Sequence, residues 1–239
     1  MSNIVQKGGP ILMYIVILCA MLALVAVLQI SDIIQKGGPL MYIIIFCSIL
    51  ALAVVLERLY NLHRARIDTK DFMSGVAMTL KRNKVMEAIE MCNNTPGPIA
   101  QIMKAGILKH DRPRTEIREA IEDAGVHEVP RLEKNLGVLA TIAHITPLLG
   151  LLGTVTGMVR AFQIIQEKAT SLYPVNPGDL AGGIWEALIT TVAGLSVAIP
   201  TFVAYNYLVS RVDGFVLDME KSATDLLNIL TTRSDKYTE

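Results

Sequence analysis

The chain has 239 residues, of which 52% are hydrophobic and 18% charged, and its mean hydropathy is +0.45. An ordinary soluble domain carries charge on about a quarter of its residues, so this composition excludes that class and predicts a membrane protein with two or more spans. The formal net charge is zero, which gives a nucleic-acid partner no support. Cys19, Cys47 and Cys92 are too few and too scattered for a disulfide framework or a zinc site, and we expect no cofactor or metal.

Four apolar stretches predict the spans, at residues 11–28, 40–56, 136–159 and 187–209. Each approaches or exceeds the roughly 20 residues that cross a hydrocarbon core. Because backbone groups in lipid must pair within their own segment, each stretch should be a helix, and the fold class is an all-α membrane protein with three to four transmembrane helices. The predicted segments are an N-terminal segment 1–38 with an extra helix at 11–30, spans at 39–57, 136–160 and 182–209, a cytoplasmic helical domain 58–135, an external loop 161–181 and a cytoplasmic helical tail 210–239.

The first two apolar stretches are near copies of each other. Gly8–Gly9–Pro10 recurs as Gly37–Gly38–Pro39, and Leu12–Met13–Tyr14 recurs as Leu40–Met41–Tyr42. Gly-Gly-Pro suits the start of a helix, because proline is tolerated in the first turn. The first copy is interpreted as a retained helix, since a small-residue cleavage site is hard to find; a cleaved or peripheral first copy is the alternative.

The distribution of charge predicts the topology. Fourteen of the 22 Lys and Arg residues lie between Glu57 and Asn135, whereas the links 29–38 and 161–181 hold one Lys each. By the positive-inside rule, the long middle segment is cytoplasmic and both short links are external. Four spans place both termini inside, and three spans would place the start outside.

Helical periodicity continues through the charged segments. Residues 71–81, 85–92 and 99–110 form short amphipathic pieces, with a break at Thr95–Pro96–Gly97–Pro98. From Thr115 the pattern predicts a helix that runs into the third span, with a kink at Pro130. The apolar spacing after Arg211 predicts that the last span continues into the cytoplasm. These cytoplasmic helices have no evident active site and are interpreted as a structural base.

The chain contains none of the common catalytic motifs, such as HExxH, GxSxG or a P-loop, so we do not expect an enzyme. The third span instead carries Gly150, Gly153 and Gly157 on one helix face, after Pro147. Small residues let helices approach closely where lipid removes the hydrophobic force between them. This face predicts tight helix packing and oligomerisation.

The chain resembles the MotA/TolQ/ExbB proton channel family over roughly residues 39 to 232. The most specific part of the resemblance is the string Pro-Leu-Leu-Gly-Leu-Leu-Gly-Thr-Val at residues 147–155. Further matching residues follow in the family's order at 57–59, 136–143, 157–158, 161–162, 186–188, 191, 194–195, 198–200 and 205–206. The first copy of the repeat departs from the family's usual three-span pattern, which affects the topology. The middle segment is short, which makes the chain more like ExbB or TolQ than MotA.

The resemblance implies a homopentamer in the bacterial inner membrane, around transmembrane helices of an ExbD/TolR-like single-span protein that carries a protonatable aspartate. Protons crossing at this interface would drive work on a TonB-like or other periplasm-spanning partner. By position, Thr154 and Thr191 match the family's pore threonines, and Glu186 matches its acidic residue in the last span. Which process is energised, whether uptake, envelope maintenance or motility, stays open.

The residues themselves support part of this assignment. An ionisable group in a span is costly, which makes Glu186 a functional candidate; the alternative is a helix-start role at the external interface, because Gly182–Gly183 precede it. Thr190 shares a face with Glu186, whereas Thr191 lies about 140° away from Glu186, so spacing favours Thr190 and the resemblance favours Thr191. Each threonine has a packing alternative, since its hydroxyl can bond its own backbone.

Three further residues of the third span have predicted roles. His144 is a candidate proton relay, with a hydrogen-bonded structural histidine as the alternative. Thr156 points away from Thr154 by about 200° and is expected to pack. Arg160 is expected to extend to the external interface.

Two rival functions remain. A non-conducting membrane scaffold would use the same glycine face but would not need Glu186, and a small-solute transporter is disfavoured because the chain lacks inverted repeats.

Overall fold

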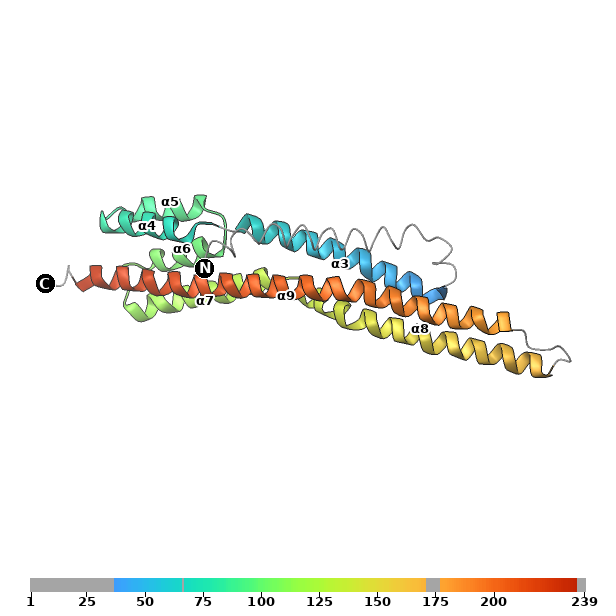
Figure 1. Ribbon diagram of the computed structural model, residues 1–239. Coiled ribbons are helices and arrows are strands. Elements are labelled where there is room, and N and C mark those ends of the chain that lie inside the picture. The colour runs from blue at the N-terminus through green and yellow to red at the C-terminus, as the bar shows by residue number, and fades with distance from the viewer. Residues whose placement is uncertain (1–36, 66, 171–176, 236–239) are drawn as a thin grey trace, which may run out of the picture. The chain divides into compact units, whose positions relative to one another are not determined.

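The computed structural model describes residues 37–65, 67–170 and 177–235 (Figure 1). Within these ranges the regular structure is entirely helical. The helices are α3 (Gly38–Ala65), α4 (Thr69–Lys81), α5 (Val85–Asn94), α6 (Pro98–Leu108), α7 (Arg114–Glu133), α8 (Leu136–Thr170) and α9 (Pro177–Asp235). The all-α fold class is confirmed. The extra span predicted at 11–30 lies outside the described residues.

Three helices of the described chain are long and apolar enough to cross a membrane. Their apolar parts lie in α3, α8 and α9, and they correspond to the last three of the four predicted apolar stretches. Because an α-helix rises 1.5 Å per residue, the 35 residues of α8 and the 59 of α9 exceed the length that a hydrocarbon core of about 30 Å requires.

The chain divides into two compact units. Unit 1 contains the described residues up to Leu56 together with Asn135–Tyr207, and unit 2 contains Glu57–Lys134 together with the described residues from Leu208 onward. Unit 1 therefore holds most of α3, all of α8 and the first part of α9. Unit 2 holds α4 to α7 and the end of α9.

Unit 1 is a packing of three helices. Met41 and Ile44 of α3 are buried together with Ala193 and Val197 of α9, and Leu149 of α8 packs against them. α3 begins at Gly38, which has a φ of 66°, and Pro39 follows in its first turn. The Gly-Gly-Pro sequence therefore starts this helix as predicted, because glycine permits the positive φ and proline needs no partner for its nitrogen.

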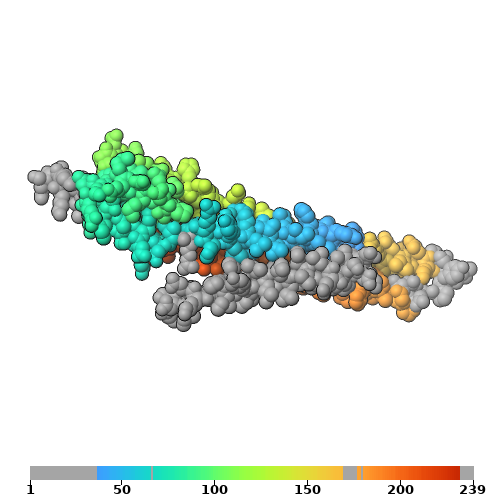
Figure 2. Space-filling view, turned by 90° about the horizontal axis from the view of Figure 1, so that it is seen from above, coloured from blue at the N-terminus to red at the C-terminus, as the bar shows by residue number. Residues whose placement is uncertain are grey.

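Unit 2 is built from short helices with buried aliphatic side chains. Figure 2 shows the side chains of α4 to α6, cyan to green, gathered into one mass on the visible face. Asp68 caps α4, since its Oδ1 accepts hydrogen bonds from the backbone nitrogens of Lys70 and Asp71 at 3.1 and 3.3 Å. The core hydrophobic side chains share an exposure of 2% or less and are Val76, Leu80, Ala88, Cys92, Ile99, Ala100, Ile102, Met103, Ile107, Leu208, Val212, Leu226 and Leu230.

Two helix boundaries differ from the sequence expectation. The helix from Arg114 does not run into the third span: α7 ends at Glu133, Asn135 has a φ of 63°, and α8 begins at Leu136. Asparagine tolerates this left-handed conformation better than most residues, so a turn separates the two helices. Pro130 lies inside α7 without ending it. The region 161–181 is also not a loop throughout, because α8 continues to Thr170 and α9 begins at Pro177.

Candidate functional site

The polar residues predicted for a proton pathway lie mostly along the contact between α8 and α9 in unit 1. Gly150, Gly153 and Gly157 of α8 all face α9. A Cβ built on Gly150 would lie 3.1 Å from both the Thr190 carbonyl oxygen and Thr191 Cα, and one on Gly157 would lie 2.7 Å from the Gly183 carbonyl oxygen. A side chain on Gly153 would collide with the Thr190 side chain. Gly150 and Gly157 therefore permit the backbones of two helices of the same chain to approach closely, and Gly153 makes room for the Thr190 side chain.

α9 contributes glycines of its own to this contact. A Cβ on Gly183 would lie 2.8 Å from the Gly157 carbonyl oxygen, and one on Gly194 would lie 2.8 Å from the Thr146 carbonyl oxygen. We call these five glycines, Gly150, Gly153, Gly157, Gly183 and Gly194, the glycine seam. A packing role was not predicted for the two α9 glycines, although Gly183 and Gly194 lie in the predicted span 182–209, where small residues are a packing signal.

Thr191 joins the two helices across the glycine seam. Its Oγ1 lies 3.0 Å from the Gly150 carbonyl oxygen on α8 and 3.3 Å from the Ala187 carbonyl oxygen on its own helix. A threonine hydroxyl has one proton, so the two carbonyls share it or take it in turn. This hydroxyl is a partly buried donor whose proton has two alternative acceptors.

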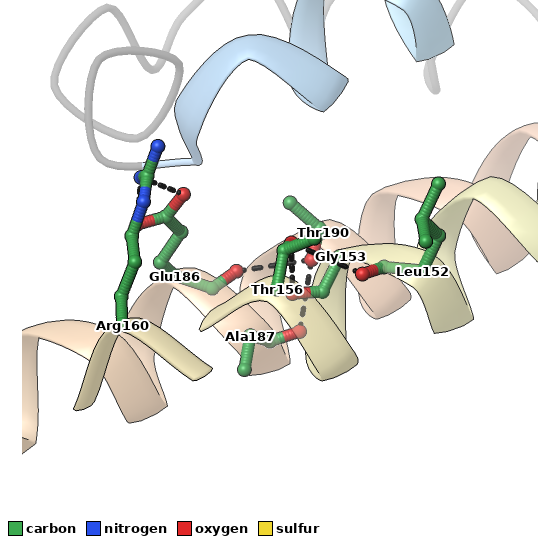
Figure 3. Close-up of polar contacts among 7 residues, drawn as sticks. All are labelled: Leu152, Gly153, Thr156, Arg160, Glu186, Ala187 and Thr190. Atoms are coloured by element: carbon green, nitrogen blue, oxygen red, sulfur yellow. Dashed lines mark hydrogen bonds and ion pairs between the residues drawn. The ribbon is translucent and has the colours of Figure 1, made fainter. Parts of the chain in front are cut away.

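Thr190 is a packing residue in this structure. It is 1% exposed, it fills the space opposite Gly153, and its Oγ1 donates to the carbonyl oxygens of Glu186 at 3.0 Å and Ala187 at 2.9 Å (Figure 3). Its contact with Glu186 is therefore to the main chain, not to the carboxylate. Of the two threonines that the sequence left open, Thr190 stays within α9 and Thr191 reaches α8.

Glu186 forms an ion pair with Arg160. The Arg160 Nη1 atom lies 2.6 Å from Glu186 Oε1 and 2.8 Å from Oε2 (Figure 3). The helix-start alternative for Glu186 is wrong, because α9 begins nine residues earlier at Pro177. Arg160 was expected to extend to the external interface, and its pairing with Glu186 was not predicted. The available signal was a charge of each sign near the ends of two adjacent apolar stretches.

Thr154 and Thr156 satisfy their hydroxyls within α8. Thr154 Oγ1 donates to the Leu151 carbonyl oxygen at 2.6 Å, and Thr156 Oγ1 lies 3.0 and 3.1 Å from the carbonyl oxygens of Leu152 and Gly153. Thr154 is half-buried and Thr156 is exposed. Neither hydroxyl bonds α9, so the structure does not join Thr154 to Thr191 by a hydrogen bond.

His144 lies apart from the residues around Glu186. Its Nδ1 is 2.7 Å from the Ala140 carbonyl oxygen, and its exposed ring meets the Phe202 ring edge to face at a centroid distance of 6.1 Å. Ten residues separate His144 from Thr154, which is about 15 Å along a helix. Pro147 lies inside α8, half-buried, between His144 and the glycines. Among the described residues, no three His, Cys, Asp or Glu side chains are grouped to hold a metal ion.

Comparisons with known proteins agree with this architecture. The sequence profile of the MotA/TolQ/ExbB proton channel family matches residues 94–221. An ExbB homolog of Methanothermobacter thermautotrophicus is 29% identical over 185 residues, which cover 77% of this chain and 64% of the relative. The biopolymer transport protein ExbB of Aquifex aeolicus is 44% identical over 89 residues, 37% of this chain and 57% of the relative. The Tol-Pal system protein TolQ of Haemophilus influenzae is 39% identical over 104 residues, 43% of this chain and 40% of the relative.

Three apolar helices, two of which meet along the glycine seam, define an integral membrane protein of the all-α class. The family profile covers more than half of the chain, so the chain belongs to the MotA/TolQ/ExbB proton channel family, and its relatives make it most similar to ExbB and TolQ. This is a family of channel and scaffold proteins rather than a class of enzymes. The predicted family is confirmed.

Proposed function

We propose that this chain is the proton-conducting channel or stator subunit of an inner-membrane motor, which couples the proton motive force to work on envelope or transport partners. The observation that carries the proposal is the placement of Glu186 and Thr191 in unit 1, where α8 and α9 approach through glycines. An ionisable group among membrane-spanning helices is costly, so its presence there points to function. The transmembrane potential supplies about 2.3 kcal/mol per proton at 100 mV, and several protons would drive one step of movement.

The proposed partners follow from the family and from the surface of unit 1. A homopentamer around an ExbD/TolR-like single-span protein with a transmembrane aspartate would require each helix to contact lipid, a neighbouring copy or the central partner. Large apolar side chains are exposed on all three helices of unit 1, including Phe46 at 66%, Leu148 at 62% and Val192 at 63%. α3 is visible as a blue strip on the face drawn in Figure 2. These surfaces are suited to lipid or helix partners, and a TonB-like or other periplasm-spanning protein would receive the work.

The proposed topology places unit 2 and the C-terminus in the cytoplasm of a bacterial cell. Its support is the concentration of Lys and Arg between Glu57 and Asn135. Arg58, directly after the apolar part of α3, is buried in unit 2, pairs with Glu57 at 2.7 Å and donates to the Arg131 carbonyl oxygen at 3.3 Å. A charged residue fixed in this way marks where α3 changes from apolar to polar surroundings.

A non-conducting scaffold is the second candidate, and a specific observation favours it. Thr154 and Thr190 bond only their own helices, and Glu186 is already paired with Arg160. A scaffold whose polar groups only brace helices would show this pattern too. The two functions differ in whether Glu186 is needed for proton movement.

The first experiment is native mass spectrometry of the protein purified in mild detergent with its genomic neighbours co-expressed. Five copies with a small single-span protein support the motor, whereas a monomer or dimer without such a companion contradicts it. The assembled complex is then placed in liposomes and its proton flux is measured for the wild type, Glu186→Gln and the control Glu220→Gln, which changes a carboxylate in unit 2. The motor requires a large loss of flux in Glu186→Gln alone, and a conducting complex with unchanged flux in this variant would remove Glu186 from the pathway.

A further inference from the structure

The ion pair between Arg160 and Glu186 involves a third helix. A Cβ built on Gly38, the first residue of α3, would collide with the Glu186 carboxylate and would lie 3.5 Å from Arg160 Nη1. Gly38 also has a φ of 66°, which other residues rarely adopt. The positive φ favours glycine at this position, and the absence of a side chain lets the carboxylate rest against the first turn of α3.

The ion pair, at the junction of α3, α8 and α9, holds the Glu186 carboxylate away from the threonines of its own helix. Thr190 lies one turn along α9 from Glu186 but meets only its main-chain oxygen, while the Glu186 side chain extends to Arg160 beside the start of α3 (Figure 3). The Glu186 side chain is 15% exposed and the Arg160 side chain 51%. One guanidinium nitrogen of Arg160 contacts both carboxylate oxygens, so a half-exposed cation orients the largely buried Glu186 carboxylate.

We propose that Arg160 is a positioning residue for proton transfer: it holds the Glu186 carboxylate at the junction of α3, α8 and α9, where the carboxylate takes up and releases the proton. This inference rests on the proposed function, because it assigns a role within proton conduction. On uptake, a carboxylate oxygen gains the proton and the pair loses its charge attraction; on release, the proton leaves and the ion pair forms again. Without Arg160, the long Glu side chain spreads over several rotamers, and the site loses its preorganisation.

The test measures proton flux per assembled complex in liposomes, with the partner co-expressed. We expect Arg160→Gln to lower the flux roughly tenfold, the size of effect found for coupled neighbouring groups. Arg160→Lys keeps a charge at this position and should retain most of the flux. Arg131→Gln is the matched control, because Arg131 forms an ion pair of similar length with Glu128 in unit 2 and should leave the flux unchanged.

A spectroscopic measurement separates positioning from bracing. The infrared band of the Glu186 carboxylate is identified by its absence in Glu186→Gln; we expect it to shift in Arg160→Gln and to stay close to its original frequency in Arg160→Lys. If Arg160 only braces the helices, Arg160→Gln will lower the melting temperature but leave flux per complex unchanged. The proposal is overturned if Arg160→Gln leaves the flux per complex unchanged or raises it, or if the Glu186 infrared band does not shift in this variant. If the wild-type complex itself does not conduct, the proposed function fails instead, and the infrared band still reports whether Arg160 positions Glu186.

Discussion

The two units hold their helices together in different ways. Unit 2 buries large aliphatic side chains such as Leu80, Ile102 and Leu226, as a soluble helical domain does. In unit 1, by contrast, glycines and threonines form the contact between α8 and α9, and large apolar side chains such as Leu148 and Ile199 remain 62% exposed.

The physical reason is the surrounding medium. In water, burial of apolar surface contributes about 25 cal/mol per Å², so the largest side chains are directed inward. In lipid this force between helices is missing, and close packing of small residues and hydrogen bonds replace it. The same chain therefore packs large side chains in unit 2 and brings two backbones close together in unit 1, so the two units should respond differently to lost and to added volume.

The largest expected effect is in the core of unit 2. Leu226 is fully buried and its Cδ2 lies against Gly106. Leu226→Ala should destabilise unit 2 by about 2–5 kcal/mol, because the cavity adds to the lost burial. Hydrogen exchange of the unit 2 amides in the detergent-solubilised protein measures this change. Leu217→Ala, at a position 59% exposed on the same helix, is the control and should have little effect. Equal effects of the two substitutions would contradict the core described for unit 2.

In unit 1 the comparison predicts the opposite sensitivity, to added volume. Gly153→Ala places a methyl group against the buried Thr190 side chain and should destabilise the protein by about 1–3 kcal/mol. Unfolding in SDS, followed by circular dichroism, measures the change. Gly182→Ala is the control, since no atom lies within 4 Å of a Cβ at that glycine. If both variants unfold like the wild type, the glycine seam does not set the helix separation.

A smaller effect is expected for the hydrogen bond across the seam. Thr191→Val keeps the shape but removes the donor to the Gly150 carbonyl oxygen, and should cost about 1 kcal/mol. Thr156→Val removes a hydroxyl that bonds only its own helix and is exposed, so it should cost less. The same SDS titration compares the two. A larger loss in Thr156→Val would show that the bond between the helices contributes no more than a local one.

The smallest effect concerns Cys92 in unit 2. Burial raises the pKa of this thiol from 9.0 to about 11, with Lys104 lowering it in part. Its folded-state pKa is above the unfolded value, so this contribution to stability is complete below about pH 9 and is lost as the pH rises toward 11. Cys92→Ala should weaken the pH dependence of thermal unfolding in this window. Rapid alkylation of Cys92 in the folded protein at pH 8 would contradict its burial.

The amino-acid sequence alone determined the helical class, the three apolar spans of the described chain and the family. It also located most of the helix ends in unit 2, such as the start of α5 at Val85 and the break around Gly97, because Gly, Pro and apolar periodicity act over a few residues. It missed the turn at Lys134–Asn135, where one left-handed residue interrupts an otherwise helical pattern.

The tertiary structure decided which groups meet. Periodicity placed Gly150, Gly153 and Gly157 on one face, but that α9 of the same chain covers this face came only from the fold. Thr191 bonds Gly150, 41 residues away, and Arg160 pairs with Glu186, 26 residues away. Helical spacing reports the face on which a side chain lies and carries no information about the partner helix, its register or its depth. For that reason the pairing of Arg160 with Glu186, and the contact of this pair with Gly38, depend on how α3, α8 and α9 pack together.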